Sequence, residues 1–359
     1  MTATPLTAQG QLRAVLAGEP PELWYRDPVS CLQSTLAAAL RHAGHDPLEV
    51  LGAHWEFRFL PGDVRPEEFY YPCAVAGDLA GSLAPHHPVS SHWHYPPDPG
   101  RSGPEQSLRG IAAAITFGQL VIAAVDNFYL PFRPAFGDVH AAHLIAVYGI
   151  DLAADQVLVS DAMPPAFAGP ITVADFLRAW SSANPPDPQD VFFSDTRIGR
   201  RFMTVTAGEP FPRLDAPMLR RILAANLAGF SGEDASDQAG WTGLPGLKLY
   251  LMSLLDACAR PDPAQLASAY PLGWGMQAQA SLHAELLRRW GTQAGLPELR
   301  EAARLVETAA HAWTGLRMTA AHGRGDPRAC AGELARHAAG LRRSYELALA
   351  GLHDAIGAL

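Results

Sequence analysis

The sequence predicts an α+β domain followed by an all-helical domain. The chain has 359 residues, about twice the usual length of a single domain. Apolar runs of strand length are confined to the first part of the chain. Beyond residue 210 the composition shifts to Ala, Leu and Arg, with apolar residues at helical spacing. We therefore expect a first domain over residues 1–210 and a second over residues 211–359.

The first domain should combine helices with an antiparallel or mixed sheet. A helix is expected over residues 30–44, because Ser30 suits an N-cap and Gly44 a C-terminal stop. Alternating apolar residues predict a strand at 54–60. Residues 83–105 are rich in Pro, His and Ser, which predicts a long surface loop. The later elements follow in chain order: helix 107–117, strand 120–125, strands 143–148 and 156–160, helix 172–180 and strand 201–206.

The second domain should contain helices alone. Its apolar residues recur every three to four positions, and few β-branched runs interrupt them. The apolar faces of these helices would allow a homodimer. The expected helices cover residues 218–227, 247–259, 276–290, 296–318 and 328–359.

Composition excludes several classes of protein. The net charge of −9 argues against nucleic-acid binding, which needs a basic surface. The longest apolar stretch, residues 111–125, is too short and too polar to span a bilayer. The first residues lack the basic and apolar regions of a signal peptide. Four scattered cysteines make no disulfide framework, and free thiols suit the cytoplasm, where we expect this protein.

Three residues form a candidate catalytic triad. Cys31 lies in the first turn of the expected helix, where the helix dipole and free N–H groups favour a thiolate. His143 and Asp161 lie on consecutive strands joined by a short turn, so they should be neighbours. An imidazole beside a thiol can take up and return its proton, and a carboxylate holds the imidazole in position. Papain-like cysteine enzymes use the same order of Cys, His and Asp.

Each of these residues also has a structural interpretation. A cysteine on an apolar helix is most often part of the core, as we expect for Cys258 and Cys330. Cys73 is a rival nucleophile, although it follows a proline and not a helix start. His140 and His143 form an HxxH pair that could bind a transition metal. We favour the triad and expect no metal.

Several motifs resemble one known family. Cys31 opens a helix, residues 57–59 read FRF, and residues 125–132 read VDNFYLPF. Residues 140–149 read HAAHLIAVYG and residues 157–161 read VLVSD. Together they resemble the butirosin biosynthesis protein H N-terminal family over roughly residues 24–165. The helical remainder is similar to a domain of unknown function that often follows it.

The resemblance implies a papain-like, C39-like fold and an acyltransferase of antibiotic or other secondary-metabolite biosynthesis. Cys31 would be the nucleophile, His143 the base and Asp161 the orienting acid. The donor would be a phosphopantetheine thioester on an acyl or peptidyl carrier protein, and the acceptor a small-molecule amine, with no other cofactor. Alternatives are a cysteine peptidase, a thioesterase-type hydrolase or cyclase, and a non-catalytic scaffold. We expect the substrate to contact Asn127, Tyr129, Phe132, His140, His92 and His94.

Two parts of this site remain open in the sequence. Cysteine peptidases of this kind carry a Gln or Asn shortly before the nucleophile to stabilise the oxyanion, and residues 26–30 contain neither. The backbone N–H groups of Cys31 and Leu32 could serve instead. The loop 83–105 is a candidate lid. A carrier protein is acidic, so a cluster of arginines near the domain boundary is a candidate docking patch: Arg197, Arg200, Arg201, Arg213, Arg220 and Arg221.

Overall fold

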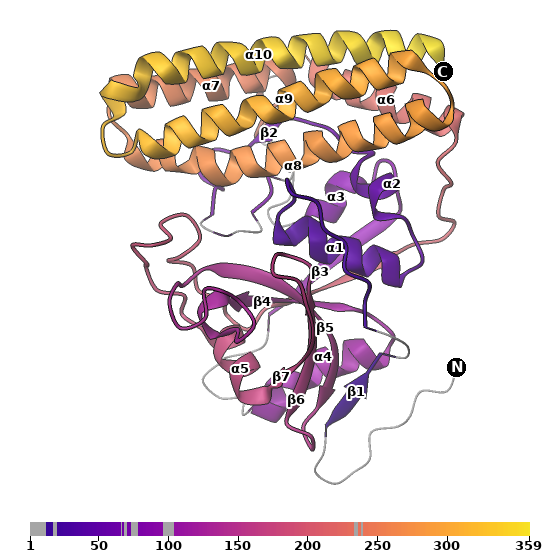
Figure 1. Cartoon of the computed structure of the whole chain (residues 1–359), viewed down its shortest axis with the longest axis vertical. Coiled ribbons are helices and arrows are strands. Elements are labelled where there is room, and N and C mark those ends of the chain that lie inside the picture. Colours follow the sequence, from indigo (N-terminus) through magenta and orange to yellow (C-terminus); the bar gives the residue numbers. More distant parts are fainter. Residues whose placement is uncertain are drawn as a thin grey trace. The chain divides into compact units, whose positions relative to one another are not determined.

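The computed structural model describes residues 12–16, 20–65, 67, 70–72, 78–95, 104–232, 236–237 and 240–359. The chain divides into two compact units (Figure 1). The first unit contains Met1–Pro47, Pro66–Phe69 and Val89–Gly208, and the second contains Leu48–Arg65, Tyr70–Pro88 and Glu209–Leu359. The final change of unit falls at residue 208. However, two segments within residues 48–88, which the sequence suggested were part of the first domain, belong to the second unit.

An antiparallel sheet forms the centre of the first unit. Seven strands in the described part of the chain build it, in the order β3-β8-β4-β5-β6-β7, with β1 also pairing with β5. The α+β class is therefore confirmed. The strands are β1 (Arg13–Val15), β3 (Val89–His94), β4 (Val121–Asp126), β5 (Ala142–Asp151), β6 (Gln156–Asp161), β7 (Phe167–Thr172) and β8 (Phe202–Ala207).

Helices cover both faces of this sheet. Helix α1 (Cys31–His42) packs against β5, with further contacts to β4, β6 and β8. Helix α4 (Pro104–Thr116) packs against β1, β4 and β5, and α5 (Val173–Ser181) packs against β4, β6 and β7. In Figure 1, α1 lies on one side of the sheet and α4 and α5 on the other. Because of this coverage, every β5 residue except Asp151 is buried. Strands β4 and β5 thus form the buried centre of the sheet.

Two sequence-based elements were wrong. Residues 89–94 form strand β3, which pairs with β8 along its whole length, and not part of a long loop. Their alternation of Ser, His and Trp has the period of a strand, but neighbouring prolines and histidines hid it. The expected strand 54–60 shrinks to β2 (Arg58–Phe59). It pairs with β10 (Gly240–Thr242) of the second unit and not with the large sheet.

Long helices dominate the second unit. Three of them begin at an aspartate N-cap with a proline in the first or second helical position. These N-caps are Asp215, Asp262 and Asp326. A short sheet of β2, β10 and β9 (Ser236–Asp237) joins the helices. The helices are α2 (Pro47–Leu51), α3 (Leu79–Leu83), α6 (Ala216–Ser231), α7 (Gly243–Ala259), α8 (Pro263–Gln293), α9 (Pro297–His322) and α10 (Pro327–Ala358).

Residues 55–59 supply the aromatic centre of the helical core. The ring of Trp55 stacks on that of Tyr345 with centroids 5.4 Å apart, and Phe57 stacks on Trp313 at 6.3 Å. Trp313 Nε1 in turn donates to the Tyr345 hydroxyl at 2.9 Å. All four side chains are buried. The helices therefore close around a segment that comes from far upstream in the chain.

Three histidines of the second unit interact with one another: His54 and His283 are buried, and His86 is half-buried. Burial, with a smaller contribution from repulsion by the neighbouring histidines, lowers the pKa of His86 and of His283 to about 4. His283 Nδ1 lies 2.7 Å from the Gly52 carbonyl oxygen, which ties α8 to the segment after α2. Protonation of His86 or His283 would place a positive charge where burial disfavours it. The neutral forms are therefore the ones that stabilise the fold.

We expect the second unit to lose stability as the pH falls. The folded-state pKa of His283 lies below its ordinary value of 6.5, so its contribution is complete above pH 6.5 and declines towards pH 4. The loss should be about 2–3 kcal/mol between pH 7 and pH 4.5. Urea unfolding at a series of pH values would measure it. His283→Asn should flatten this dependence, whereas His353→Asn on the exposed face of α10 should not; equal slopes for both would contradict the prediction.

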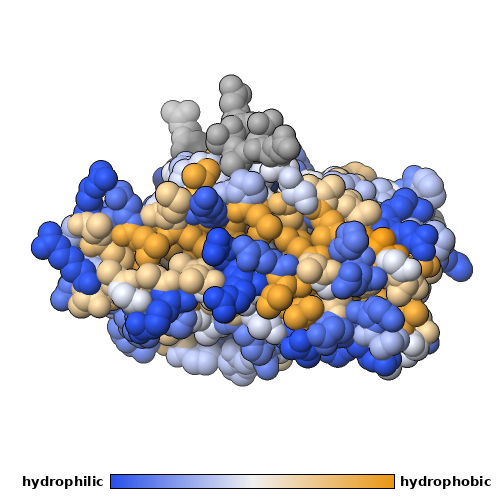
Figure 2. All heavy atoms as spheres, turned by 90° about the horizontal axis from the view of Figure 1, so that it is seen from above, coloured by the Kyte–Doolittle hydropathy of each residue, from blue (hydrophilic) through white to orange (hydrophobic). Residues whose placement is uncertain are grey.

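Apolar side chains also gather on the face shown in Figure 2. Among the exposed large apolar residues, Met252 lies on α7 and Leu347 on α10. The predicted homodimer would use such faces and stays a prediction. Within the described residues, no helix is both long enough and apolar enough to cross a membrane.

Candidate active site

The first turn of α1 presents Cys31. Ser30 caps the helix: its hydroxyl accepts from Leu32 N–H at 3.3 Å, while the Gln33 side chain accepts from Ser30 N–H at 3.0 Å. This capping box fixes where the helix begins and so places Cys31 as its first residue. The predicted helix start is confirmed. Because Leu32 N–H already has a partner, it would have to leave Ser30 to act as an oxyanion donor.

His143 and Asp161 meet at one end of the sheet. His143 Nε2 lies 2.8 Å from Asp161 Oδ2, and neither side chain is exposed to solvent. Strand β6 pairs antiparallel with β5, so the end of β6 lies beside the start of β5. An ionised carboxylate has no proton, so Nε2–H is the donor, and the lone pair of the neutral ring lies on Nδ1. The ring is thus in the form that can accept a proton at Nδ1.

Asp161 has partners besides His143. Its Oδ1 accepts from Met163 N–H at 2.9 Å, and its Oδ2 accepts from Arg133 Nη1 at 3.3 Å. Arg133 also donates to the carbonyl oxygens of Met163 and Pro164. Hydrogen bonds from several directions fix the carboxylate that orients His143. Sequence reasoning missed Arg133, because its 28-residue separation from Asp161 carries no local signal.

The structure places the three residues of the predicted triad in the first unit. His143 and Asp161 are hydrogen-bonded, as consecutive strands suggested. Cys31 is fully buried in the first turn of α1. Helix α1 packs directly against β5, and His143 is the second residue of that strand. A catalytic role for the three remains a prediction.

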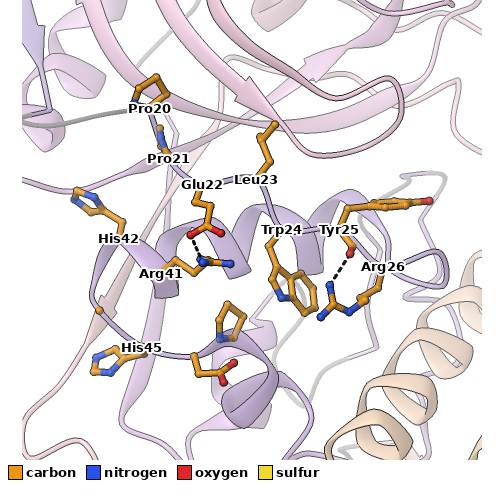
Figure 3. A pocket seen from close by; sticks show the side chains of 13 residues that line it. Pro20, Pro21, Glu22, Leu23, Trp24, Tyr25, Arg26, Arg41, His42 and His45 are labelled. Carbon is orange, nitrogen blue, oxygen red and sulfur yellow. Dashed lines mark hydrogen bonds and ion pairs between the residues drawn. The ribbon is translucent and has the colours of Figure 1, made fainter. Parts of the chain in front are cut away.

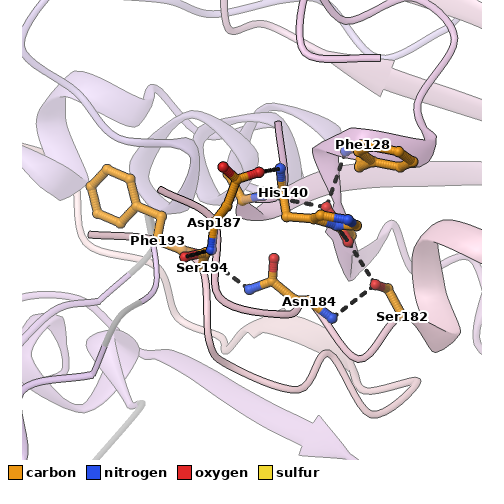
Figure 4. Close-up of polar contacts among 9 residues, drawn as sticks. Phe128, His140, Ser182, Asn184, Asp187, Phe193 and Ser194 are labelled. Carbon is orange, nitrogen blue, oxygen red and sulfur yellow. Dashed lines mark hydrogen bonds and ion pairs between the residues drawn. The ribbon is translucent and has the colours of Figure 1, made fainter. Parts of the chain in front are cut away.

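His140 and Asp126 form a second His–Asp pair, and Figure 4 shows the polar contacts around His140. His140 Nδ1 is 2.7 Å from Oδ2 of Asp126, a buried residue at the end of β4. The same Oδ2 accepts from Ser182 Oγ at 2.6 Å. The His140 ring stacks on Phe128 with centroids 4.1 Å apart. Sequence reasoning placed His140 at the substrate and missed Asp126 and Ser182; the position of Asp126 at the end of a buried strand was the available signal.

The other predicted substrate residues spread over the first unit. Asn127 is buried at the end of β4, and its Oδ1 has no hydrogen-bond partner among the described residues. The rings of Tyr129 and His140 pack edge to face, with their centroids 6.0 Å apart. Phe132 stacks on Phe167 at 4.2 Å, and both line a pocket of about 540 Å³ along β7.

His92 and His94 lie on strand β3. Their ring centroids are 4.6 Å apart, and His94 Nε2 lies 2.9 Å from Thr204 Oγ1 on β8. Burial, followed by repulsion from His92, lowers the pKa of His94. They are therefore neighbours on a strand, whereas the sequence suggested a loop.

The metal-binding interpretation receives no geometric support from the HxxH pair. His140 and His143 turn to different carboxylates, those of Asp126 and Asp161. Among the described residues, no group of three or more His, Cys, Asp or Glu side chains could hold a metal ion. The rival nucleophile Cys73 lies outside the described residues. The thiols of Cys258 and Cys330, which are 3.7 Å apart, belong to the helical unit.

The six arginines considered for carrier docking do not belong to one unit. Arg197, Arg200 and Arg201 are in the first unit, and the other three are in the second. Arg200 donates to Ser107 Oγ at 2.8 Å, and Arg201 pairs with Glu67 and lies over the Trp93 ring at 5.5 Å. These two side chains therefore have internal roles.

A large pocket lies next to α1 (Figure 3). Its volume is about 1100 Å³, and residues 20–26 line it together with the end of α1 and the turn that follows. Within it, Arg41 pairs with Glu22, and the Arg26 guanidinium lies 4.8 Å from the centre of the Trp24 ring. The segment that leads to Cys31 thus carries charged and aromatic groups on an open surface.

Comparisons with known proteins extend the sequence resemblance. No curated protein matches the chain. One protein-family model matches residues 30–162 of the chain. This segment begins at the N-cap of α1 and ends one residue after Asp161. It therefore contains Cys31, both His–Asp pairs and most of the sheet. Over residues 30–162 the chain matches the family described as butirosin biosynthesis protein H, N-terminal, and the expected resemblance is confirmed for this segment.

Proposed function

We propose that this protein is a biosynthetic acyltransferase that forms an amide through an acyl-enzyme on Cys31. The family match over residues 30–162 supports an acyl-transfer enzyme of antibiotic biosynthesis. The donor in this proposal is a thioester on a carrier protein, and the acceptor is a small amine. The observation that carries the proposal is the buried pair of His143 on β5 and Asp161 on β6, because the helix that begins with Cys31 packs against β5.

The proposed reaction has two steps. Cys31 Sγ, after passing its proton to His143 Nδ1, attacks the thioester carbonyl carbon, and the donor thiol leaves with that proton. Exchange of one thioester for another keeps the acyl group activated. An amine then attacks the acyl-enzyme, the C–S bond breaks, and Cys31 is regenerated. The helix dipole stabilises the negative charge at Sγ in both steps.

Access to Cys31 is part of this proposal. Cys31, His143 and Asp161 are all buried, each with at most 1% of its surface exposed. Burial excludes water, which favours an amine over hydrolysis once the acyl group is bound. The donor therefore has to open a path to the thiol before the first step.

Loading experiments test the proposal. The protein would be incubated with acetyl and glycyl thioesters of N-acetylcysteamine, quenched in acid, and analysed by intact and peptide mass spectrometry. We expect the acyl adduct on the peptide that contains Cys31, and its conversion to an amide when glycinamide is added. Release of free acid alone would favour a hydrolase. Turnover without any adduct on Cys31 would exclude the proposed mechanism.

A further inference from the structure

The second His–Asp pair has the geometry of a proton acceptor. Asp126 is fully buried and accepts four hydrogen bonds: Oδ1 from the backbone N–H groups of Phe128 and Ala141, and Oδ2 from Ser182 Oγ and His140 Nδ1. Ser182 Oγ in turn accepts from Asn184 N–H at 2.9 Å, so its own proton points to Asp126. The carboxylate therefore has no free lone pair for a substrate.

These contacts determine the tautomer of His140. Both oxygens of an ionised Asp126 accept, so His140 Nδ1 is the protonated nitrogen. In the neutral ring the lone pair then lies on Nε2. No described residue forms a hydrogen bond with Nε2, and the side chain is 17% exposed. His140 thus presents a proton-accepting nitrogen towards solvent.

The surrounding loop holds this ring rigidly. His140 N–H donates to Asp187 Oδ2 at 2.9 Å, and hydrogen bonds from the backbones of His140 and Gln189 lower the pKa of Asp187. Phe128 fixes the plane of the ring, with an interplanar angle of 8°. Asn184 adopts a left-handed conformation, with φ of 43°, that is uncommon for a residue other than glycine. Strained, well-supported backbone of this kind is typical of functional sites.

The two His–Asp pairs share one edge of the sheet and differ in exposure. Asp126 ends β4 and Asp161 ends β6, and both strands flank the start of β5. The Cα atoms of His140 and His143, three residues apart, are separated by at most about 11 Å. The His143 ring is fully buried, whereas His140 reaches solvent. An amine that arrives from solvent can therefore meet His140 Nε2 more readily than it can meet His143.

From this geometry we propose that His140, held by Asp126, is the general base for the acceptor amine. The inference rests on the proposed function. The neutral amine nitrogen attacks the carbonyl carbon of the Cys31 thioester, and a C–N bond forms. The amine proton moves to His140 Nε2, and the C–S bond breaks with its electron pair left on Cys31 Sγ. The positive charge that develops on His140 is balanced by the buried Asp126 carboxylate. His140 then releases the proton to solvent.

Single-turnover experiments separate the two halves of the reaction. Cys31 would be loaded with the glycyl thioester of N-acetylcysteamine, freed of excess donor, and then mixed with glycinamide. His140→Asn preserves a donor to Asp126 in place of Nδ1–H but has no Nε2. We expect it to acylate Cys31 within about threefold of the wild-type rate, and to transfer the acyl group to glycinamide about 10²–10³-fold more slowly. His311→Asn, an exposed substitution on α9, should change neither rate.

Rescue guards against a purely structural effect. In His140→Ala, imidazole added to the buffer should restore part of the transfer rate, because the ring site is partly open to solvent. Three outcomes would overturn the inference. They are wild-type transfer rates in both His140→Asn and His140→Ala, loss of acylation in His140→Asn, and loaded wild-type protein that gives no amide. If wild-type Cys31 is never acylated, the proposed function fails and this inference fails with it.

Discussion

Replacing Cys31 with alanine should abolish acyl transfer. The substitution removes the only atom that could hold the acyl group in the proposed mechanism, so transfer should fall by roughly 10⁴-fold or more. The cost in stability should be small, about 1 kcal/mol, because one buried sulfur atom is lost from the first turn of α1. Amide formation from a glycyl thioester and glycinamide, followed by chromatography, would measure the loss.

Cys258→Ala is the matched control for Cys31→Ala. Cys258 is a buried helical cysteine of the second unit, and burial, followed by its contact with Cys330, raises the pKa of its thiol to about 11. A thiol of this kind is a poor nucleophile at neutral pH. The Cys258 variant should therefore retain transfer and adduct formation. Comparable transfer by Cys31→Ala and wild type would exclude Cys31 as the nucleophile.

Replacing Asp161 with alanine should impair both catalysis and stability. Without the carboxylate, His143 loses the partner that fixes its tautomer, and acylation of Cys31 should slow by about 10²–10⁴-fold. Arg133, whose side chain is 11% exposed, would lose its ion-pair partner. An unpaired buried cation should cost roughly 3–5 kcal/mol in the free energy of unfolding. Stopped-flow acylation and urea unfolding report the two effects separately.

A double variant separates the two roles of Asp161. Arg133→Met removes the buried cation, so Asp161→Ala/Arg133→Met should recover much of the lost stability. It should not recover acylation, since His143 still lacks its carboxylate. Recovery of both would mean that Asp161 acts only as the counterion of Arg133. A single Arg133→Met variant completes the cycle and should acylate Cys31 faster than either variant that lacks Asp161.

The parts of the site that could be predicted depend on short connections. His143 and Asp161 lie on strands joined by a turn of a few residues, and such strands usually pair. The start of α1 could be predicted because Ser30 caps it locally. Both features arise from residues near one another in the sequence, where spacing and side-chain chemistry carry the information.

The parts that could not be predicted depend on distant contacts. Ser182 reaches Asp126 across 56 residues, and no periodic pattern marks either as a partner of His140. The segment containing Trp55 and Phe57 has the alternation of a strand, yet its aromatic rings stack on Tyr345 and Trp313, which lie in helices near the other end of the chain. Local alternation shows that side chains will be buried but not which element will bury them.

The interleaved units have a consequence for the newly made chain. When residue 208 has been synthesised, every segment of the first unit exists, but Leu48–Arg65 and Tyr70–Pro88 still lack their partners. Until α7, α9 and α10 emerge from the ribosome, Trp55, Phe57 and Phe59 lack the helices that bury them, although every segment of the first unit has been made. We therefore expect these side chains to be buried only once the C-terminal helices have been made, and no single cut in the chain separates the two units.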